Sequence, residues 1–290
     1  FLATPGLDVL DAGQKHARVG GNTAPWFEQD GAPTLVEGLQ KRHDAGGVLL
    51  RRGRLSRGLV VGSKTATDVD GVEFDVRLSR DGIPFLMHDH ELIRTTMHPG
   101  VVNALTVQEL GEIDFRGVET PAQAATRVPT LQAAIESLQN RTRLFAELKI
   151  GPGTNAQQVG QAAANIYLEA SPGKSADIMS FAAAAIDAYR DYAPANSVLL
   201  LPDDIDTTST RAREQALADA RACGSTTVGL RDDIVTAGVV AYAHRWDIAV
   251  LTWPNEDLAA ARRGIHAGVD IMVTDSPDAL IKRLTPLAPT

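Results

Sequence analysis

Short apolar runs alternate with longer amphipathic or alanine-rich segments from about residue 142 to the end of the chain. The apolar runs are 143–150, 177–181, 197–201, 226–230, 248–252 and 270–274. The segments that follow them have the composition of helices and lie near 155–170, 183–192, 210–222, 234–245, 256–266 and 277–284. Strands that alternate with helices in this way predict a parallel sheet covered by helices.

The strand pattern continues upstream in one further apolar run, 72–76, which brings the expected strands to seven. One more strand upstream would give eight, the number in a (β/α)8 barrel. Residues 90–130 interrupt the alternation, and we expect them to form a small insertion after the second strand, with a short helix near 106–113. The first 70 residues match the pattern poorly, but we expect residues 1–290 to form a single barrel domain.

Two carboxylates, Glu73 and Asp75, lie on the upstream strand two positions apart. Side chains at this spacing point to the same face of a strand. A glycine-containing turn and a second apolar run, 83–87, then lead to His88 and Asp89. Two acids with a nearby imidazole are suited to a hard metal ion and a proton-transfer group. The simpler alternative is that the acids form a solvated strand face or pair with arginine.

Later strands carry further polar residues near their C-terminal ends, where barrel enzymes place their active sites. Glu147 would add a third carboxylate to Glu73 and Asp75, and three carboxylates suit Mg²⁺ or Ca²⁺. Lys149 shares the face of Glu147, so its ammonium could neutralise a phosphate oxygen or only pair with Glu147. Two aromatic residues at strand ends would contact a substrate, unless they serve only packing: Phe181 and Trp253.

Several short motifs follow one another in a distinctive order. They are Glu73-x-Asp75, Asp81-Gly-x-Pro84, His88-Asp89, Leu92-x-Arg94-Thr-Thr96, Arg127-Val-Pro-Thr-Leu131, Phe145-Ala-Glu147-Leu-Lys149, Ser180-Phe181, Leu251-Thr-Trp253-Pro-Asn255, and the closing pair Gly268-Val-Asp270 and Thr274-Asp275-Ser-Pro277. In this order they resemble the motifs of the glycerophosphodiester phosphodiesterase family, and the resemblance covers residues 70–285.

The resemblance implies a (β/α)8 barrel and a metal-dependent hydrolysis of glycerophosphodiesters to glycerol phosphate and an alcohol. Glu73, Asp75 and Glu147 would hold the metal ion. Members of the family use two histidines, one that deprotonates the attacking glycerol hydroxyl and one that protonates the leaving alcohol. A cyclic phosphate would then be opened by water. His88 would be one of these histidines, and Lys149 would assist as a charge-neutralising catalytic group.

The family usually opens with a strand that ends in His-Arg-Gly, and two segments fit that place. In the first, His16 would be the other catalytic histidine and Arg18 a substrate-binding residue. In the second, the apolar residues 48–50 give a better strand, but Arg51 stands where the family has histidine and would bind the substrate's phosphate.

Two other functions remain open from the sequence. A phospholipase-D-like relative would act on a lysophospholipid or sphingolipid, which an apolar rim along residues 90–130 would favour. A barrel in which Arg51 replaces the histidine would bind a phosphate-bearing ligand without turnover, because the loss of a proton-transfer group typically costs about 10²–10⁴ in rate.

Composition adds few constraints. The chain has 290 residues, 44% hydrophobic and 22% charged, as is ordinary for a globular protein. Its net charge of −8 argues against nucleic acid as a partner, and the family resemblance implies a small-molecule phosphodiester or lysolipid substrate. No apolar run is long enough to predict a transmembrane helix. One cysteine cannot form an internal disulfide. The chain begins with Phe1 rather than methionine, which favours a secreted or periplasmic location after removal of a leader.

Overall fold

The structure, a computed structural model, describes residues 48–51, 71–96, 98–114, 127–138, 143–170, 176–193, 196–275 and 277–284. All of them belong to one compact unit that runs from Pro33 to Thr290. The prediction of a single domain over residues 1–290 extends to residues 1–47, which lie outside the described part of the chain.

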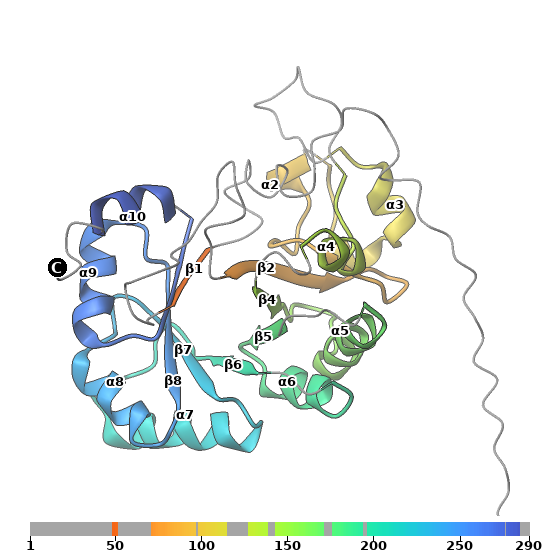
Figure 1. Cartoon of the computed structure of the whole chain (residues 1–290). Coiled ribbons are helices and arrows are strands. Elements are labelled where there is room, and N and C mark those ends of the chain that lie inside the picture. The colour runs from red at the N-terminus through yellow and green to blue at the C-terminus, as the bar shows by residue number, and fades with distance from the viewer. Residues whose placement is uncertain are drawn as a thin grey trace, which may run out of the picture. The chain divides into compact units, whose positions relative to one another are not determined.

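A curled nine-stranded sheet forms the centre of this unit (Figure 1). Its parallel strands, in spatial order, are β9 (Ile271–Thr274), β8 (Ala249–Trp253), β7 (Thr227–Arg231), β6 (Ser197–Leu200), β5 (Ala176–Ser180), β4 (Arg143–Leu148) and β2 (Gly71–Leu78). Strand β1 (Val48–Arg51) pairs with β9 on one side and with β2 on the other. These pairings close the sheet into a ring and confirm the predicted barrel.

The direction of β1 differs from the prediction of a wholly parallel barrel. Val48 pairs with Thr274 and Arg51 with Ile271, so β1 runs antiparallel to β9, and it is antiparallel to β2 as well. Antiparallel neighbours need no helical crossover between them, whereas parallel neighbours do. The strand therefore closes the ring as an antiparallel member, and not as the parallel first strand that the alternation further along the chain led us to expect.

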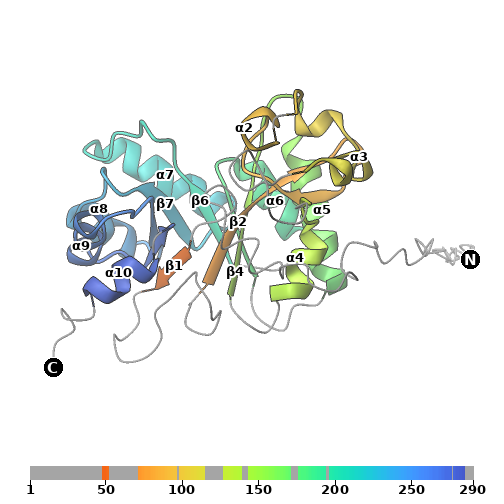
Figure 2. The ribbon, with the colours of Figure 1, turned by 90° about the horizontal axis from the view of Figure 1, so that it is seen from above.

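Helices follow the parallel strands and cover the outside of the sheet (Figures 1 and 2). They are α4 (Leu131–Leu138), α5 (Ala156–Ala170), α6 (Ala183–Arg190), α7 (Thr210–Ala222), α8 (Ala237–His244), α9 (Leu258–Ala267) and α10 (Pro277–Leu284). Each buries an apolar stripe; in α5 it includes Val159, Ala163 and Tyr167, which recur every four residues. Polar side chains cap the N-termini of α7, α8 and α9, which fixes where these helices begin.

The alternation of side chains along β2 separates two environments. Phe74 and Val76 point outward into the large core between sheet and helices. Glu73 and Asp75, at the alternate positions, point into the ring, whose interior holds a smaller apolar cluster that includes Phe145 and Leu251. The pleat of the strand thus delivers two acids to the ring interior while its apolar residues anchor it to the helices.

The predicted insertion follows β2. Strand β3 (Pro84–Leu86) pairs antiparallel with β2, and α2 (Ile93–Thr96), the 3₁₀ helix η1 (Val102–Ala104) and α3 (Val107–Glu112) come next. These elements have an apolar core of their own, composed of Phe85, Met87, Leu92, Val102, Leu110 and Ile113. Because this core binds the insertion to the outer edge of β2, His88 and Asp89 are held close to the ring.

Candidate active site

An acidic cluster lies at the C-terminal ends of β2 and β4. Asp75 pairs directly with Glu147 across the two strands, and Glu73 lies two positions before Asp75. One oxygen from each of the three carboxylates lies within 4.8 Å of the others, and all three residues are buried. Their exposed fractions are 7%, 5% and 8%, so the cluster is not the solvated strand face that the sequence alone also allowed.

The ammonium group of Lys149 lies against this cluster. Its Nζ is 3.1 Å from Asp75 Oδ1 and 2.9 Å from Glu147 Oε1. Burial lowers the pKa of Lys149, but the charges of Asp75 and Glu147 outweigh this effect, and the pKa lies above its ordinary value. Burial also raises the pKa of Glu147, and Lys149 opposes that rise only in part. The cluster is therefore short of positive charge, which favours a bound cation.

A histidine with a carboxylate partner stands beside the cluster. His88 Nδ1 lies 2.8 Å from Asp89 Oδ1, and Arg94 Nε donates a hydrogen bond to the other oxygen of Asp89. Burial raises the pKa of Asp89, but the hydrogen bonds from Arg94 and His88 outweigh it and hold the pKa below its ordinary value. The carboxylate thus orients the imidazole through Nδ1 and leaves Nε2 for another partner.

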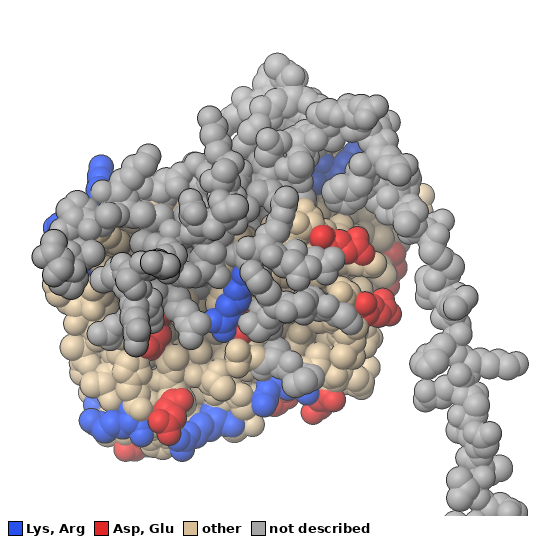
Figure 3. Space-filling model, viewed as in Figure 1, with Lys and Arg blue, Asp and Glu red and all other residues tan. Residues whose placement is uncertain are grey.

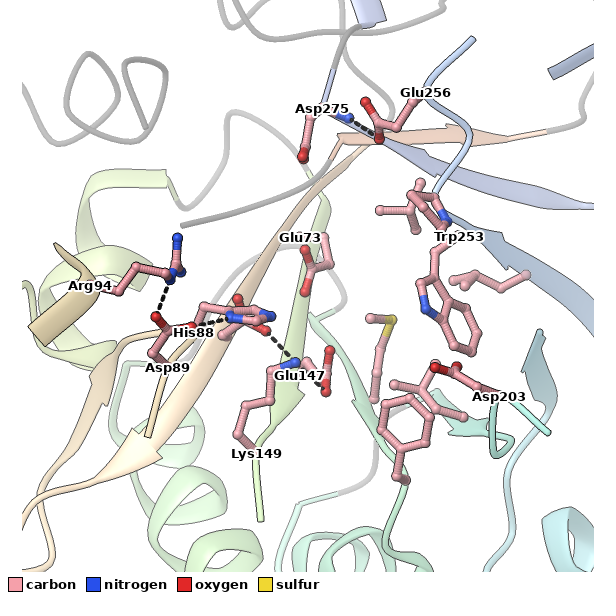
Figure 4. A pocket seen from close by; sticks show the side chains of 17 residues that line it. Glu73, His88, Asp89, Arg94, Glu147, Lys149, Asp203, Trp253, Glu256 and Asp275 are labelled. Atoms are coloured by element: carbon pink, nitrogen blue, oxygen red, sulfur yellow. Dashed lines mark hydrogen bonds and ion pairs between the residues drawn. The ribbon is translucent and has the colours of Figure 1, made fainter. Parts of the chain in front are cut away.

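Two aromatic rings form the opposite wall. Phe181 and Trp253 pack edge to face with their centroids 5.7 Å apart. The ring of Trp253 has room because residue 229 is a glycine; a Cβ there would lie 2.9 Å from the Trp253 ring. In Figure 4, Trp253 faces the acidic cluster from the side opposite His88. Both rings line the cavity, and their contact with a substrate stays a prediction.

All of these groups line one cavity of about 520 Å³ (Figure 4). Apolar side chains of the ring interior, among them Met179 and Leu251, also line it. Its wall includes acids from the segments after β6, β8 and β9, which the sequence did not single out as substrate contacts: Asp203, Glu256 and Asp275. Asp275 belongs to the closing motif Thr274-Asp275-Ser-Pro277, whereas only the position after a strand could have indicated Asp203 and Glu256.

The donor set of the acidic cluster fits a hard divalent cation. Carboxylate oxygens are the ligands that Mg²⁺ and Ca²⁺ prefer, and both ions leave coordination positions for a phosphate or water. Three buried carboxylates with one neighbouring ammonium leave an excess of negative charge that a divalent ion would balance. Glu73, Asp75 and Glu147 could therefore hold a metal ion.

The structure brings Glu73, Asp75, His88, Glu147, Lys149, Phe181 and Trp253 together in this cavity. The predicted roles of His16 and Arg18 fall on residues outside the described part. Arg51 is the last residue of β1, and its backbone pairs with Ile271, the first residue of β9. The side chain of Arg51 is not described, so its role in binding the substrate's phosphate stays a prediction.

Comparison with known proteins assigns the chain to a family. The model of the glycerophosphoryl diester phosphodiesterase family matches residues 64–279. The chain belongs to this family. The match includes the acidic cluster, His88, Lys149 and both aromatic residues of the wall, and it confirms the resemblance seen in the sequence motifs.

Relatives in this family are distant. The glycerophosphodiester phosphodiesterase GDPD4 of Arabidopsis thaliana is 27% identical over 72% of this chain, and the chain spans only 62% of that relative's length. YhdW of Bacillus subtilis is 24% identical over 74% of this chain, and the match covers 86% of the length of YhdW.

Solved structures of the family share the fold. An Oleispira antarctica phosphodiesterase in complex with the product sn-glycerol-3-phosphate has a TM-score of 0.63 at 22% identity, over 73% of this chain and 83% of its own. A glycerophosphodiester phosphodiesterase from Parabacteroides distasonis has a TM-score of 0.61 at 19% identity, over 76% and 86%.

On the face seen in Figure 3, the coloured Lys and Arg side chains lie among Asp and Glu rather than forming one basic surface. Among the described helices, none is both long and apolar enough to cross a membrane.

Proposed function

We propose that this chain is a metal-dependent phosphodiesterase that hydrolyses glycerophosphodiesters to glycerol phosphate and an alcohol. The observation that carries the proposal is a single cavity in which a buried carboxylate cluster, an ammonium group and an oriented imidazole face one another. Membership of the glycerophosphoryl diester phosphodiesterase family supports the same reaction.

Glu73, Asp75 and Glu147 would hold the ion, either Mg²⁺ or Ca²⁺. When bound, such an ion would polarise the phosphodiester as a Lewis acid and orient it for in-line displacement. The burial of the three carboxylates keeps water from competing for them and strengthens their interaction with a cation.

His88 would transfer a proton at Nε2. Its Nδ1 faces Asp89, so Nε2 is the nitrogen available to the substrate. The imidazole would either take the proton of the attacking glycerol hydroxyl or give a proton to the leaving alcohol. A second proton-transfer group is required for the other step, and His16 remains the proposed residue.

Lys149 would stabilise negative charge on the phosphate. An ammonium has three N–H donors, and Asp75 and Glu147 accept two of them. The third donor is left for a phosphate oxygen, so the ion pair with Glu147 and a role at the substrate are compatible. Phe181 and Trp253 would contact the apolar part of the substrate, since both rings line the same cavity.

The described insertion does not favour the lysolipid alternative. A lipid-binding rim would need exposed apolar side chains along residues 90–130, but Leu92, Val102, Leu110 and Ile113 are buried in the insertion's own core. Ile93 is the large apolar residue that stays exposed in this described segment. A small, water-soluble diester is therefore the better substrate for the cavity.

Phosphorus NMR of a reaction with glycerophosphocholine tests the proposal, because it identifies the bond that breaks. With Mg²⁺ or Ca²⁺ the wild type should convert glycerophosphocholine and water to glycerol phosphate and choline. His88→Gln should lower the rate by about 10²–10⁴, the usual contribution of a general acid or base. His98→Gln is the matched control, since His98 is exposed in the insertion and does not line the cavity.

Three results would contradict the proposal. Formation of choline phosphate and glycerol would mean that the other ester bond is cleaved. Activity unchanged in His88→Gln would remove the imidazole from the mechanism. No turnover at saturating metal would support the alternative of a barrel that binds a phosphate-bearing ligand without turnover.

A further inference from the structure

Strand β2 presents a third polar residue in the same row as its two acids. Arg77 lies two positions after Asp75 and four after Glu73, so the three side chains leave the strand on one face. The two acids belong to the candidate metal site, whereas Arg77 lies just beyond it and is absent from the lining of the cavity.

The guanidinium of Arg77 holds the backbone of His88. Its Nε donates to the carbonyl oxygen of His88 at 2.9 Å, and its Nη2 donates to the same oxygen at 2.6 Å. One residue earlier, the amide of Met87 donates to the carbonyl oxygen of Asp75 at 3.0 Å. Strand β2, which carries Glu73 and Asp75, therefore forms hydrogen bonds to the chain on both sides of the His88 Cα.

We propose that Arg77 is a positioning residue that fixes His88 at its working distance from the acidic cluster. This inference rests on the proposed role of His88. Arg77 does not need to touch the substrate; it acts through the backbone that carries the imidazole. Asp89 fixes the rotation of the His88 ring, and Arg77 fixes the position of the His88 backbone.

The chemistry of arginine suits this position. A planar guanidinium can present two N–H groups to one acceptor, whereas lysine presents a single mobile ammonium.

Gly151, in the loop after β4, leaves room for this arrangement. A Cβ on Gly151 would lie 3.2 Å from Arg77 Nη1 and 3.5 Å from Nδ1 of His90. Its backbone has no positive φ, so alanine is compatible with its conformation. Gly151→Ala would therefore press on the guanidinium while leaving its charge and both of its donors in the protein.

Steady-state kinetics of four variants test the proposal. Arg77→Met should lower kcat by about 10- to 100-fold, since a displacement of about 1 Å in a reacting group can cost about 10²-fold. KM should stay near the wild-type value, and the metal concentration for half-maximal activity should not rise, because the variant removes a positive charge near Asp75 and Glu147. Arg77→Lys, which can restore one of the two hydrogen bonds, and Gly151→Ala should both fall between Arg77→Met and wild type.

Arg80→Met is the matched control. Arg80 also makes two hydrogen bonds, to Ala104 O at 2.9 Å and to Glu109 at 2.9 Å, but both lie within the insertion and away from the cavity. Its kcat should equal that of wild type. A loss in Arg80→Met as large as in Arg77→Met, or a wild-type kcat in Arg77→Met, would overturn the proposal.

Histidine ring NMR separates this inference from the proposed reaction, because it needs no turnover. The His88 signals, assigned by their loss in His88→Gln, should be single and sharp in wild type and in Arg80→Met. In Arg77→Met they should broaden or split as the ring samples several positions. Unchanged His88 signals in Arg77→Met would refute the positioning role even if the protein hydrolysed no diester at all.

Discussion

Replacement of Lys149 by methionine should lower the stability of the metal-free protein against unfolding and increase its affinity for a divalent ion. Nζ lies 3.1 Å from Asp75 and 2.9 Å from Glu147, and the three side chains are 18%, 7% and 10% exposed. At an effective dielectric constant of about 20, unit charges about 3 Å apart attract by roughly 5–6 kcal/mol before desolvation is counted. Loss of one partner of a buried ion pair typically costs about 3–5 kcal/mol in total.

We expect a cost of about 3 kcal/mol for Lys149→Met, at the lower end of that range, because Glu147 can relieve the repulsion by taking up a proton. Burial already raises the pKa of Glu147, so the proton is bound more readily there than in the unfolded chain. For a domain of this size, about 3 kcal/mol corresponds to a fall in Tm of roughly 6–12 °C. Thermal unfolding in excess chelator measures it.

The same variant should respond more strongly to metal. Without the ammonium, the three carboxylates attract a divalent ion with no competing cation, so the dissociation constant should fall. A ligand that binds the native state stabilises it by RT ln(1 + [L]/Kd), so Mg²⁺ or Ca²⁺ should raise the Tm of Lys149→Met further than that of wild type. Turnover should nevertheless decrease, because the phosphate loses a hydrogen-bond donor.

Arg80→Met again serves as the control. It removes an exposed ion pair with Glu109, which contributes little to stability because solvent screens it, and it should leave the response to metal unchanged. Equal Tm values for wild type and Lys149→Met in chelator, or weaker metal binding by Lys149→Met, would refute the electrostatic reasoning.

Three further predictions concern stability at low pH, the aromatic wall of the cavity and the apolar core. The pKa of Asp89 lies below its ordinary value of 3.8, because the hydrogen bonds from Arg94 and His88 outweigh the effect of burial. The ionised Asp89 therefore stabilises the folded protein fully above pH 3.8, and this stabilisation is lost as the pH falls through the lower pKa of the folded state. Asp89→Asn should flatten the dependence of the urea midpoint on pH in that range. The added Cβ of Gly229→Ala would lie 2.5 Å from Leu200 Cδ2 and 2.9 Å from the Trp253 ring, so this variant should displace both side chains, which line the cavity. It should raise KM more than it lowers kcat, as initial rates over a substrate series will show; an unchanged KM would argue against a substrate contact at this wall. Phe74→Ala, at a fully buried residue, should cost about 3–5 kcal/mol in urea unfolding, and a cost below about 1 kcal/mol would contradict its place in the core.

The sequence predicted the strands and helices well where apolar runs alternate with amphipathic segments. The helix over 210–222 and the helix over 277–284 have the predicted bounds. The geometry of a helix or strand sets the period of its apolar residues, so a short stretch of sequence is enough to predict these elements. The direction of β1 could not be predicted in this way, because a short strand of three apolar residues and Arg51 can pair in either direction, and the ring decides which one is used.

The candidate site likewise has a part that local sequence predicts and a part that depends on contacts distant in sequence. Glu73 and Asp75 share a face because of strand geometry, which the sequence shows directly. That Asp75 lies opposite Glu147 depends on the register of β2 against β4, which no local pattern specifies. Arg77 shares the spacing of the two acids, yet its role became visible only when the insertion brought the His88 carbonyl within reach of it.

The most direct test of a metal-dependent phosphodiesterase is the rate of glycerol phosphate release as a function of free Mg²⁺ or Ca²⁺. It should be measured for wild type, Glu73→Gln and the matched control Glu136→Gln, whose glutamate is exposed on α4. We predict no release in chelator, saturation with metal for wild type and Glu136→Gln, and almost none for Glu73→Gln at any metal concentration. Release that persists in chelator, or that saturates equally in Glu73→Gln, would contradict the proposal that the acidic cluster is the metal site of this chain.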